Sequence, residues 1–277
     1  MLAKRVATAL ILMAILLPAV FWYPPRVWGW VSLIFLAIAA FEWARLLHAA
    51  SGALAVAVLV AVGGLLYLGL RGEQTPAPPF LLVVALALTL FWLLEGWRRL
   101  RLLQARGGGR LLAGVLLLGA WLAMYELREI SVIALLSSMA LVWVADIAAY
   151  FVGRALGKRK LAPQISPGKS WEGAIGGAIF VVAMGLLSAT LPQFSGSLPT
   201  LLVNRFSAIG AAALLLILTA LSVVGDLHES LLKRQAGVKD SGTSLPGHGG
   251  VLDRIDALIP VMPAALLLFV WVQQGVR

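Results

Sequence analysis

The sequence predicts an all-α integral membrane protein with about nine transmembrane helices, its N-terminus in the cytoplasm and its C-terminus outside. Of its 277 residues, 61% are hydrophobic and 12% are charged, whereas soluble domains are typically about 45–50% apolar and about 25% charged. The mean hydropathy is +0.96. The apolar residues form long runs separated by short polar segments, and Lys and Arg are distributed unevenly among those segments.

The apolar runs predict the helices individually. Most approach the roughly 20 residues needed to cross about 30 Å of hydrocarbon, and lipid offers backbone groups no partners, so each run should be helical. The first run follows Lys4 and Arg5 as in a signal peptide, but it lacks a small-residue cleavage site and leads directly into another apolar run. We therefore expect it to be retained. The runs are 6–23, 27–41, 53–70, 79–95, 111–127, 130–151, 173–191, 207–225 and 257–272.

The distribution of cations predicts the orientation. With the N-terminus in the cytoplasm, seventeen Lys and Arg residues lie on the cytoplasmic side and five, including Arg277, on the other. Cytoplasmic segments of membrane proteins are enriched in these residues. Two polar segments, 152–172 and 226–256, then face the cytoplasm from a C-terminal region, 141–277. Residues 1–140 form an N-terminal region of about five helices.

Composition also excludes several classes of chemistry. The chain contains no cysteine, so it has no disulfide and no thiolate site. We interpret the net charge of +10 as a signal of membrane orientation. It does not indicate nucleic-acid binding, because no basic run is interleaved with aromatic residues as on nucleic-acid-binding surfaces. In the N-terminal region, Glu42 and His48 lie near a membrane boundary, where such residues are usually solvated.

The segment 226–256 alternates carboxylates and cations around a turn rich in Gly and Pro. Its centre, 245–250, reads Leu-Pro-Gly-His-Gly-Gly and excludes regular helix. Asp253 and Asp256 share one face of the helix entering the ninth run. Carboxylates suit hard divalent cations and Lys and Arg suit phosphate, but these residue types alone favour a metal site and plain ion pairing equally. Four residues form one stripe on the helix leaving the eighth run: Asp226, Glu229, Ser230 and Lys233.

A second polar segment follows the sixth apolar run. Asp146 and Tyr150 share a helix face there, and an aspartate inside an apolar run should face the protein interior, a cavity or a partner. The segment 157–173 contains two prolines and several cations; we expect it to be irregular, and on composition alone a plain basic loop is favoured. Gly173 and Gly177 form a small-xxx-small pair that suits close helix contact, within the chain or across a homodimer.

These segments together carry a recognisable pattern. Residues 230–256 read Ser-x-x-Lys-Arg, four residues, Lys-Asp, then Leu-Pro-x-His-Gly-Gly-x-x-Asp-Arg-x-Asp, which resembles the signature of the phosphatidate cytidylyltransferases (CDP-diacylglycerol synthases). Ala-Asp at 145–146, Tyr150 and the run Ser-Pro-Gly-Lys-Ser-Trp-Glu-Gly at 166–173 resemble a second motif of that family. One departure is His228, where the family pattern leads us to expect an aromatic residue, typically Phe.

The resemblance implies an enzyme of phospholipid biosynthesis in the inner membrane, with its active site on the cytoplasmic face. It would convert CTP and phosphatidic acid into CDP-diacylglycerol and pyrophosphate. It implies Mg²⁺ on Asp226 and Asp253, with Asp146 positioning a second cation or an arginine. His248 either binds phosphate or stabilises the turn. The catalytic residues implied are Asp226, Lys233, Arg234, Lys239, Asp240, His248, Asp253, Arg254 and Asp256. The substrate-binding residues implied are Asp146, Tyr150, Arg154, Lys158, Lys160, Ser166, Lys169, Ser170, Glu172 and Ser230.

Two other functions share some of these features. A CTP-dependent lipid kinase of the polyprenol type also needs membrane spans, Mg²⁺ and basic loops. A transporter would account for nine spans and for Asp146 inside one of them. Transport is disfavoured because the acidic residues gather in the polar segments rather than at the midplane of the bilayer, and no inverted repeat is evident.

Overall fold

The computed structural model describes residues 2–47, 50–72 and 77–274; His48 and Arg277 lie outside them. Within these ranges, nine helices are long and apolar enough to cross a membrane, which confirms the predicted all-α polytopic class. They are Lys4–Phe21, Pro25–Leu46, Gly52–Leu70, Pro79–Leu102, Gly109–Ile130, Val132–Leu156, Trp171–Ser188, Leu198–Gln235 and Leu252–Gln273.

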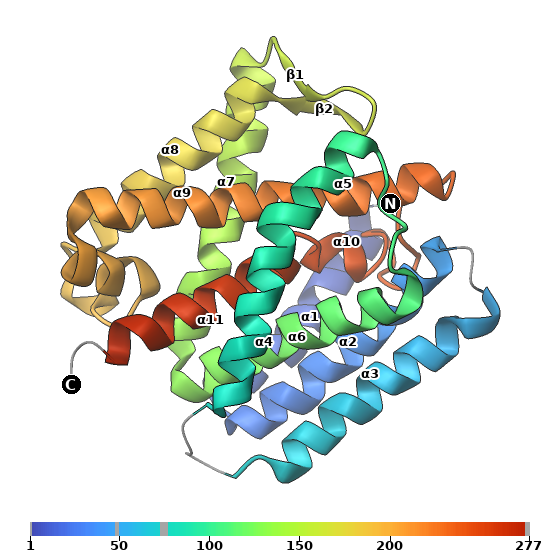
Figure 1. The fold of residues 1–277 in the computed structure, drawn as a ribbon, viewed down its shortest axis with the longest axis horizontal. Helices are drawn as coiled ribbons and strands as arrows, with labels where there is room; N and C mark the ends of the chain where they lie inside the picture. Colours follow the sequence, from blue (N-terminus) through green and yellow to red (C-terminus); the bar gives the residue numbers. More distant parts are fainter. Residues whose placement is uncertain (1, 48–49, 73–76, 275–277) are drawn as a thin grey trace.

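The N-terminal region forms one group of helices (Figure 1). Helix α2 packs against α3 and α6, and its first residue is a proline, as is that of α4; this position needs no backbone N–H. Helix α4 runs into α5 through a π-helical turn, η1. The elements are α1 (Leu2–Phe21), α2 (Pro25–Leu46), α3 (Ala50–Leu70), α4 (Pro79–Leu90), η1 (Phe91–Gly96), α5 (Trp97–Leu102) and α6 (Gly109–Ile130).

The C-terminal region is built around a helix that crosses the width of the molecule, α9 (Figure 1). Helix α8 packs against α7 and α9, while α11 contacts α4, α6 and α9 and so joins the two regions. The elements are α7 (Val132–Leu156), β1 (Lys160–Ala162), β2 (Ser166–Ser170), α8 (Trp171–Ser188), η2 (Pro192–Phe194), α9 (Leu198–Gln235), α10 (Leu252–Ile255) and α11 (Leu258–Gln274).

The segment 157–173 is more regular than predicted. Strands β1 and β2 form an antiparallel hairpin that pairs Lys160 with Ser170 and Ala162 with Ser166, and it projects from one end of the molecule (Figure 1). Both prolines are compatible with it, because Pro163 lies in the turn and Pro167 lies in a two-stranded sheet whose strands are both edges. The expectation of an irregular loop was therefore wrong here.

Helix α9 is longer than the predicted run 207–225. Its backbone departs from helical geometry at Ser207, where φ is 62° and ψ is 174°. Beyond this break the helix continues to Gln235, so the first ten residues of the polar segment 226–256 are helical. The stripe predicted from their spacing therefore lies on one continuous helix that carries it out of the apolar layer.

Gly173 and Gly177 form a close contact within the chain. A Cβ atom at Gly173 would lie 2.7 Å from the carbonyl oxygen of Ala149, and one at Gly177 would lie 2.7 Å from that of Ala145. Both acceptor residues belong to α7. The two glycines therefore allow α8 to approach the α7 backbone, and this pair is used inside the protomer.

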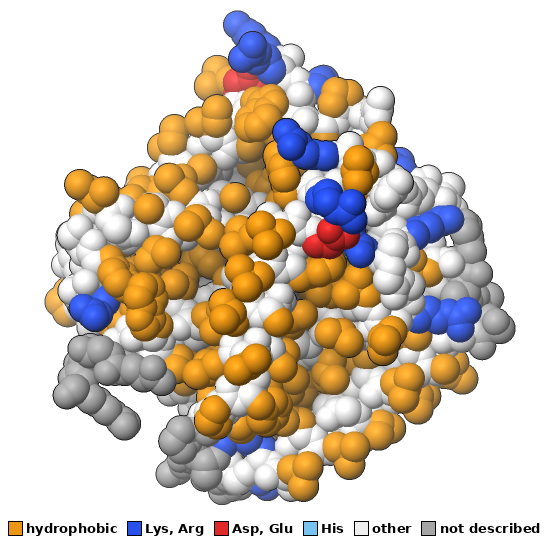
Figure 2. All heavy atoms as spheres, in the orientation of Figure 1, with side chains coloured by type: hydrophobic (Ala, Val, Ile, Leu, Met, Phe, Trp, Pro, Cys, Tyr) orange, Lys and Arg blue, Asp and Glu red, His pale blue; other side chains and the backbone are white. Residues whose placement is uncertain are grey.

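Contacts gather the predicted cytoplasmic segments at one end of the molecule. The Arg5 side chain donates to the carbonyl oxygen of Gly247, Gln235 donates to that of Leu103, and Arg234 donates to that of Ile165. At the other end, Arg26 donates to the carbonyl oxygen of Arg71. Figure 2 shows Lys and Arg side chains gathered over the hairpin and α5, while most of the remaining face is apolar. The segments that the sequence assigns to the cytoplasmic side therefore meet at one end of the structure, and Arg26 and Arg71, which it assigns to the opposite side, meet at the other end.

Candidate active site

A polar cavity of about 650 Å³ lies where α7, the hairpin, the start of α8 and α9 meet. Helix periodicity places its α7 residues on one stripe, along which the Arg154 guanidinium donates to the Tyr150 hydroxyl at 3.2 Å. The cavity gathers seven of the site residues predicted from the sequence: Asp146, Tyr150, Arg154, Ser166, Lys169, Ser170 and Asp226.

Asp226 is the charged centre of this cavity. Its carboxylate forms an ion pair with Lys169 of β2 and lies 3.5 Å from the Ser230 hydroxyl one turn along α9. Asp146 and Asp256 lie near enough for their charges to interact with those of Asp226 and Lys169. Asp226 is thus the carboxylate that contacts the ammonium group of Lys169, and Asp146 and Asp256 lie in the neighbourhood of this pair.

A second cluster of charged side chains surrounds Lys233. This residue lies one helical turn after Glu229 on the same face of α9. Its ammonium group forms ion pairs with Glu229 and with Asp253, the latter at 2.7 Å. Asp253 also accepts hydrogen bonds from the backbone N–H groups of Ser241 at 3.0 Å and Gly250 at 2.8 Å. Asp256 lies close enough to Glu229 and Lys233 to interact with them electrostatically.

The base of the hairpin is held by Glu172. Its carboxylate accepts hydrogen bonds from the backbone N–H groups of Lys158 at 3.0 Å and Arg159 at 3.2 Å. Ser170 caps α8 by accepting from the N–H of Gly173 at 3.1 Å, a common role for serine at this position. The side chains of Lys158 and Lys160 are exposed. Among these predicted binding residues, Glu172 therefore shapes the hairpin that presents Lys169.

The loop between α9 and α10 places the remaining predicted residues at its surface. Gly247 and Gly249 adopt positive φ, 80° and 85°, which glycine tolerates without strain. The carbonyl oxygen of His248 accepts from the Arg254 guanidinium at 2.6 Å, and its N–H donates to the carbonyl oxygen of Leu245. The backbone of His248 thus stabilises the turn. Lys239, Asp240 and Arg254 are exposed.

His228 occupies an aromatic environment, although it replaces the aromatic residue expected there. Its side chain is 2% exposed. The ring lies 5.2 Å from that of Trp92 in an edge-to-face arrangement and 5.9 Å from that of Trp43. The imidazole therefore fills the space of an aromatic ring, on a different face of α9 from Asp226.

Glu42 is buried, although its place near a membrane boundary predicted a solvated residue. Expected to be solvated, it is 2% exposed. It accepts hydrogen bonds from the hydroxyl of Ser244 at 2.7 Å and the N–H of Leu252 at 2.8 Å. Because its partners lie about two hundred residues further along the chain, no local pattern around Glu42 predicts its burial.

The donor set around Asp226 fits a hard divalent cation. Asp226 and Asp146 line the same cavity and supply carboxylate oxygens, which Mg²⁺ prefers, and the Asp226 carboxylate already pairs with the ammonium group of Lys169. Within the described residues no three His, Asp or Glu side chains form a preassembled metal cluster. Such a cluster is not required, because Mg²⁺ usually takes one or two carboxylates plus water and phosphate.

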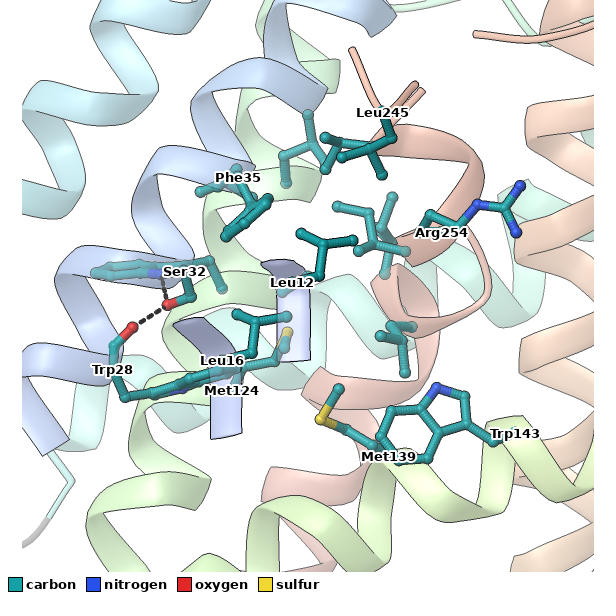
Figure 3. Close-up of a pocket in the computed structure, with 18 residues that line it drawn as sticks. Leu12, Leu16, Trp28, Ser32, Phe35, Met124, Met139, Trp143, Leu245 and Arg254 are labelled. Atoms are coloured by element: carbon teal, nitrogen blue, oxygen red, sulfur yellow. Dashed lines mark hydrogen bonds between the residues drawn. The ribbon is translucent and has the colours of Figure 1, made fainter. Parts of the chain in front are cut away.

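An apolar cavity of about 230 Å³ lies beside the α9–α10 loop (Figure 3). Leu12 and Leu16 of α1 line it together with Trp143 of α7. Trp143 stands about one helical turn before Asp146 on α7. Arg254 also lines this cavity. Elements that supply polar groups to the site therefore also border an apolar space within the membrane-spanning part.

Comparison with known proteins decides the family. A model of the cytidylyltransferase family matches residues 3–272. The chain belongs to this family. It is 39% identical over 279 residues to a phosphatidate cytidylyltransferase of Pseudomonas aeruginosa, an alignment covering 96% of this chain and 97% of that protein.

Other members of the family match over shorter stretches. A phosphatidate cytidylyltransferase of Brucella suis is 53% identical over 132 residues, 48% of this chain and 44% of the relative. One of Bacillus subtilis is 50% identical over 125 residues, 44% of this chain and 42% of the relative. The alignments to these two relatives thus span less than half of their length.

Proposed function

We propose that this protein is a phosphatidate cytidylyltransferase, which converts CTP and phosphatidic acid into CDP-diacylglycerol and pyrophosphate. The observation that carries the proposal is the polar cavity. There the two polar segments, more than fifty residues apart in the sequence, supply Lys169 and Asp226 to one ion pair. Family membership and the names of the relatives support the same reaction.

The chemistry requires two polyanions to approach one another. An anionic phosphate oxygen of the lipid attacks the α-phosphorus of CTP, and the bond from that phosphorus to the bridging oxygen breaks, releasing pyrophosphate. The attacking oxygen carries no proton to remove, so charge neutralisation and positioning are the main tasks. Lys169 and Arg154 face the cavity and would bind phosphate oxygens there. Lys233, at the edge of the site, would neutralise charge on the departing pyrophosphate.

Mg²⁺ is the proposed cofactor. Asp226 would hold it, and we propose Asp256 as the second carboxylate because its backbone lies against that of α9 beside Asp226, where a Cβ atom at Gly225 would lie 2.6 Å from the carbonyl oxygen of Asp256. Asp253, the ligand implied by the sequence, already accepts hydrogen bonds from Lys233, Ser241 and Gly250, so it stays a prediction. When bound, Mg²⁺ would stabilise negative charge on the nucleotide phosphates.

The lipid substrate and the membrane location follow from the same arrangement. The nine long apolar helices among the described residues support a substrate that is itself held in the membrane, and the apolar cavity beside Trp143 would accommodate part of one hydrocarbon chain (Figure 3). The predicted positive-inside orientation would place the polar cavity at the cytoplasmic face of the inner membrane, where CTP is present. A homodimer stays a prediction, because Gly173 and Gly177, which suggested it, contact α7 of the same chain.

Product analysis tests the proposed function. Purified protein in detergent or lipid should convert CTP and phosphatidic acid, with Mg²⁺, into equal amounts of CDP-diacylglycerol and pyrophosphate. The Asp226→Asn variant is the matched control, because it keeps the size of the side chain and removes its charge. Failure of the wild-type protein to form CDP-diacylglycerol would contradict the proposal.

A further inference from the structure

Glu42 connects the N-terminal region to the signature loop, here defined as residues 239–252 between α9 and Asp253. The carboxylate comes from α2, and its four hydrogen-bond donors all belong to that loop. They are the hydroxyls of Ser241 at 3.1 Å and Ser244 at 2.7 Å, and the backbone N–H groups of Val251 at 3.2 Å and Leu252 at 2.8 Å.

The number of donors matches the chemistry of a carboxylate. An ionised carboxylate accepts at about four lone-pair sites and donates none, so four donors can satisfy it without a cation. Two of those donors are N–H groups at the start of α10, which has only four residues. Glu42 thus supplies the acceptor for a helix start that the loop itself leaves without a side-chain cap.

Glu42 and Asp253 hold the same residue from two sides. The Ser241 hydroxyl donates to Glu42, while the Ser241 N–H donates to Asp253 at 3.0 Å. Asp253 in turn pairs with Lys233. Ser241 and Asp253 therefore link the Glu42 carboxylate to the ammonium group of Lys233.

The loop backbone approaches Glu42 closely at two glycines. A Cβ atom at Gly242 would lie 2.5 Å from Oε1 of Glu42, and one at Gly250 would lie 2.5 Å from Oε2. Helix α1 adds contacts on the other side of the loop, where Arg5 donates to the carbonyl oxygen of Gly247 and Thr8 to that of Pro246. Two N-terminal helices therefore clasp the loop, and Glu42 is its buried anchor.

We propose that Glu42 is a positioning residue for catalysis, which fixes the signature loop so that Asp253 and Lys233 keep their places beside the polar cavity. The proposal rests on the proposed function. Glu42 would give the N-terminal region a role in positioning the active site, whereas the sequence motifs lie entirely in the C-terminal half.

The test is Glu42→Gln, which keeps the shape of the side chain but replaces one acceptor oxygen with an NH₂ group. This group donates and so cannot accept from the hydroxyl and N–H donors of the loop. We expect kcat to fall by about 10- to 100-fold, the range that follows from a displacement of about 1 Å in an active site. Hydrogen exchange at the amides of Val251 and Leu252 should accelerate. The exchange measurement needs no substrate, so it tests Glu42 even where the proposed function fails.

The matched control is Glu126→Gln. Glu126 is also buried, at 1% exposure, but it pairs with Arg71 at 2.8 Å, away from the loop. This variant should keep the kcat of its folded fraction and the exchange rates of the loop. A double-mutant cycle between Glu42→Gln and Ser241→Ala should show losses that are less than additive, because the two changes break the same contact.

Several results would overturn the proposal. One is wild-type kcat and unchanged loop exchange in Glu42→Gln; another is an equal loss of kcat in both glutamate variants. Strictly additive losses in the cycle would count against it as well. Where Glu42→Gln does not insert, the Ser241→Ala, Ser244→Ala double variant removes two donors and carries the same expectations.

Discussion

Asp226 is the residue at which the charges of the site meet, since it pairs with Lys169 and interacts with Asp146 and Asp256. Changing Asp226→Asn should leave membrane insertion intact and lower kcat by about 100-fold or more, because charge stabilisation by a bound metal is worth several kcal/mol. Initial rates measured across a Mg²⁺ titration check this. Near-normal rates at saturating Mg²⁺ would show that the carboxylate is structural.

Asp253 and Asp256 distinguish a loop contact from a metal contact. In Asp256→Asn the half-saturating Mg²⁺ concentration should rise about 10-fold or more, as losing even a supporting group typically weakens metal affinity 10- to 100-fold. In Asp253→Asn the rate should fall while that concentration stays near the wild-type value, because the lost contacts are those to Lys233 and the loop N–H groups. The opposite pattern would restore Asp253 as the ligand that the sequence implies.

For individual residues, the sequence predicts which charged side chains belong to the candidate site but not which of them form ion pairs with one another. The two polar segments led to Lys169 and Asp226, and both line the same cavity. The pairing of Lys233 with Asp253 depends on the path of the loop, which no periodicity describes. Glu42 could not be predicted from the single sequence, because burial of a charged residue depends on donors supplied by distant segments.

At the scale of elements, the contact between α7 and α8 joins two helices that both line the polar cavity. Gly177→Ala would place a methyl group 2.7 Å from the carbonyl oxygen of Ala145, and overpacking of this kind typically costs about 1–3 kcal/mol. Thermal unfolding in detergent should show a lower Tm. The control is Gly69→Ala, where an added Cβ meets no atom within 4 Å. Equal Tm values for the two variants would contradict the contact.

The helices follow from the sequence more readily than the segments between them. Long apolar runs leave the backbone no alternative to helix in lipid, and all nine predicted runs correspond to helices among the described residues. The end of α9 and the hairpin at 160–170 lie in polar segments, where hydropathy gives no boundary. These two segments contact each other, as where the Arg234 guanidinium donates to the carbonyl oxygen of Ile165, and such long-range contacts cannot be read from local sequence.

At the scale of the whole molecule, the uneven charge distribution predicts the orientation in the membrane. A reporter fused after Arg277 should behave as periplasmic, and one inserted in the segment 152–172 as cytoplasmic, because Lys and Arg favour the cytoplasmic side. Alkaline phosphatase and a fluorescent protein are suitable complementary reporters. A cytoplasmic signal from the fusion after Arg277 would rule out a chain with nine spans and a cytoplasmic N-terminus.

The most direct test of the account follows the phosphorus atoms of CTP. Purified protein is supplied with phosphatidic acid, a polyprenol alcohol, Mg²⁺ and CTP labelled at either the α- or the γ-phosphate. We expect the α label and the cytidine to enter the lipid fraction together, while the γ label is released as pyrophosphate. Transfer of the γ label into lipid, with the α label left in water, would identify a kinase and contradict the assignment. Lipid that gains neither label would contradict it as well, and would return transport to consideration.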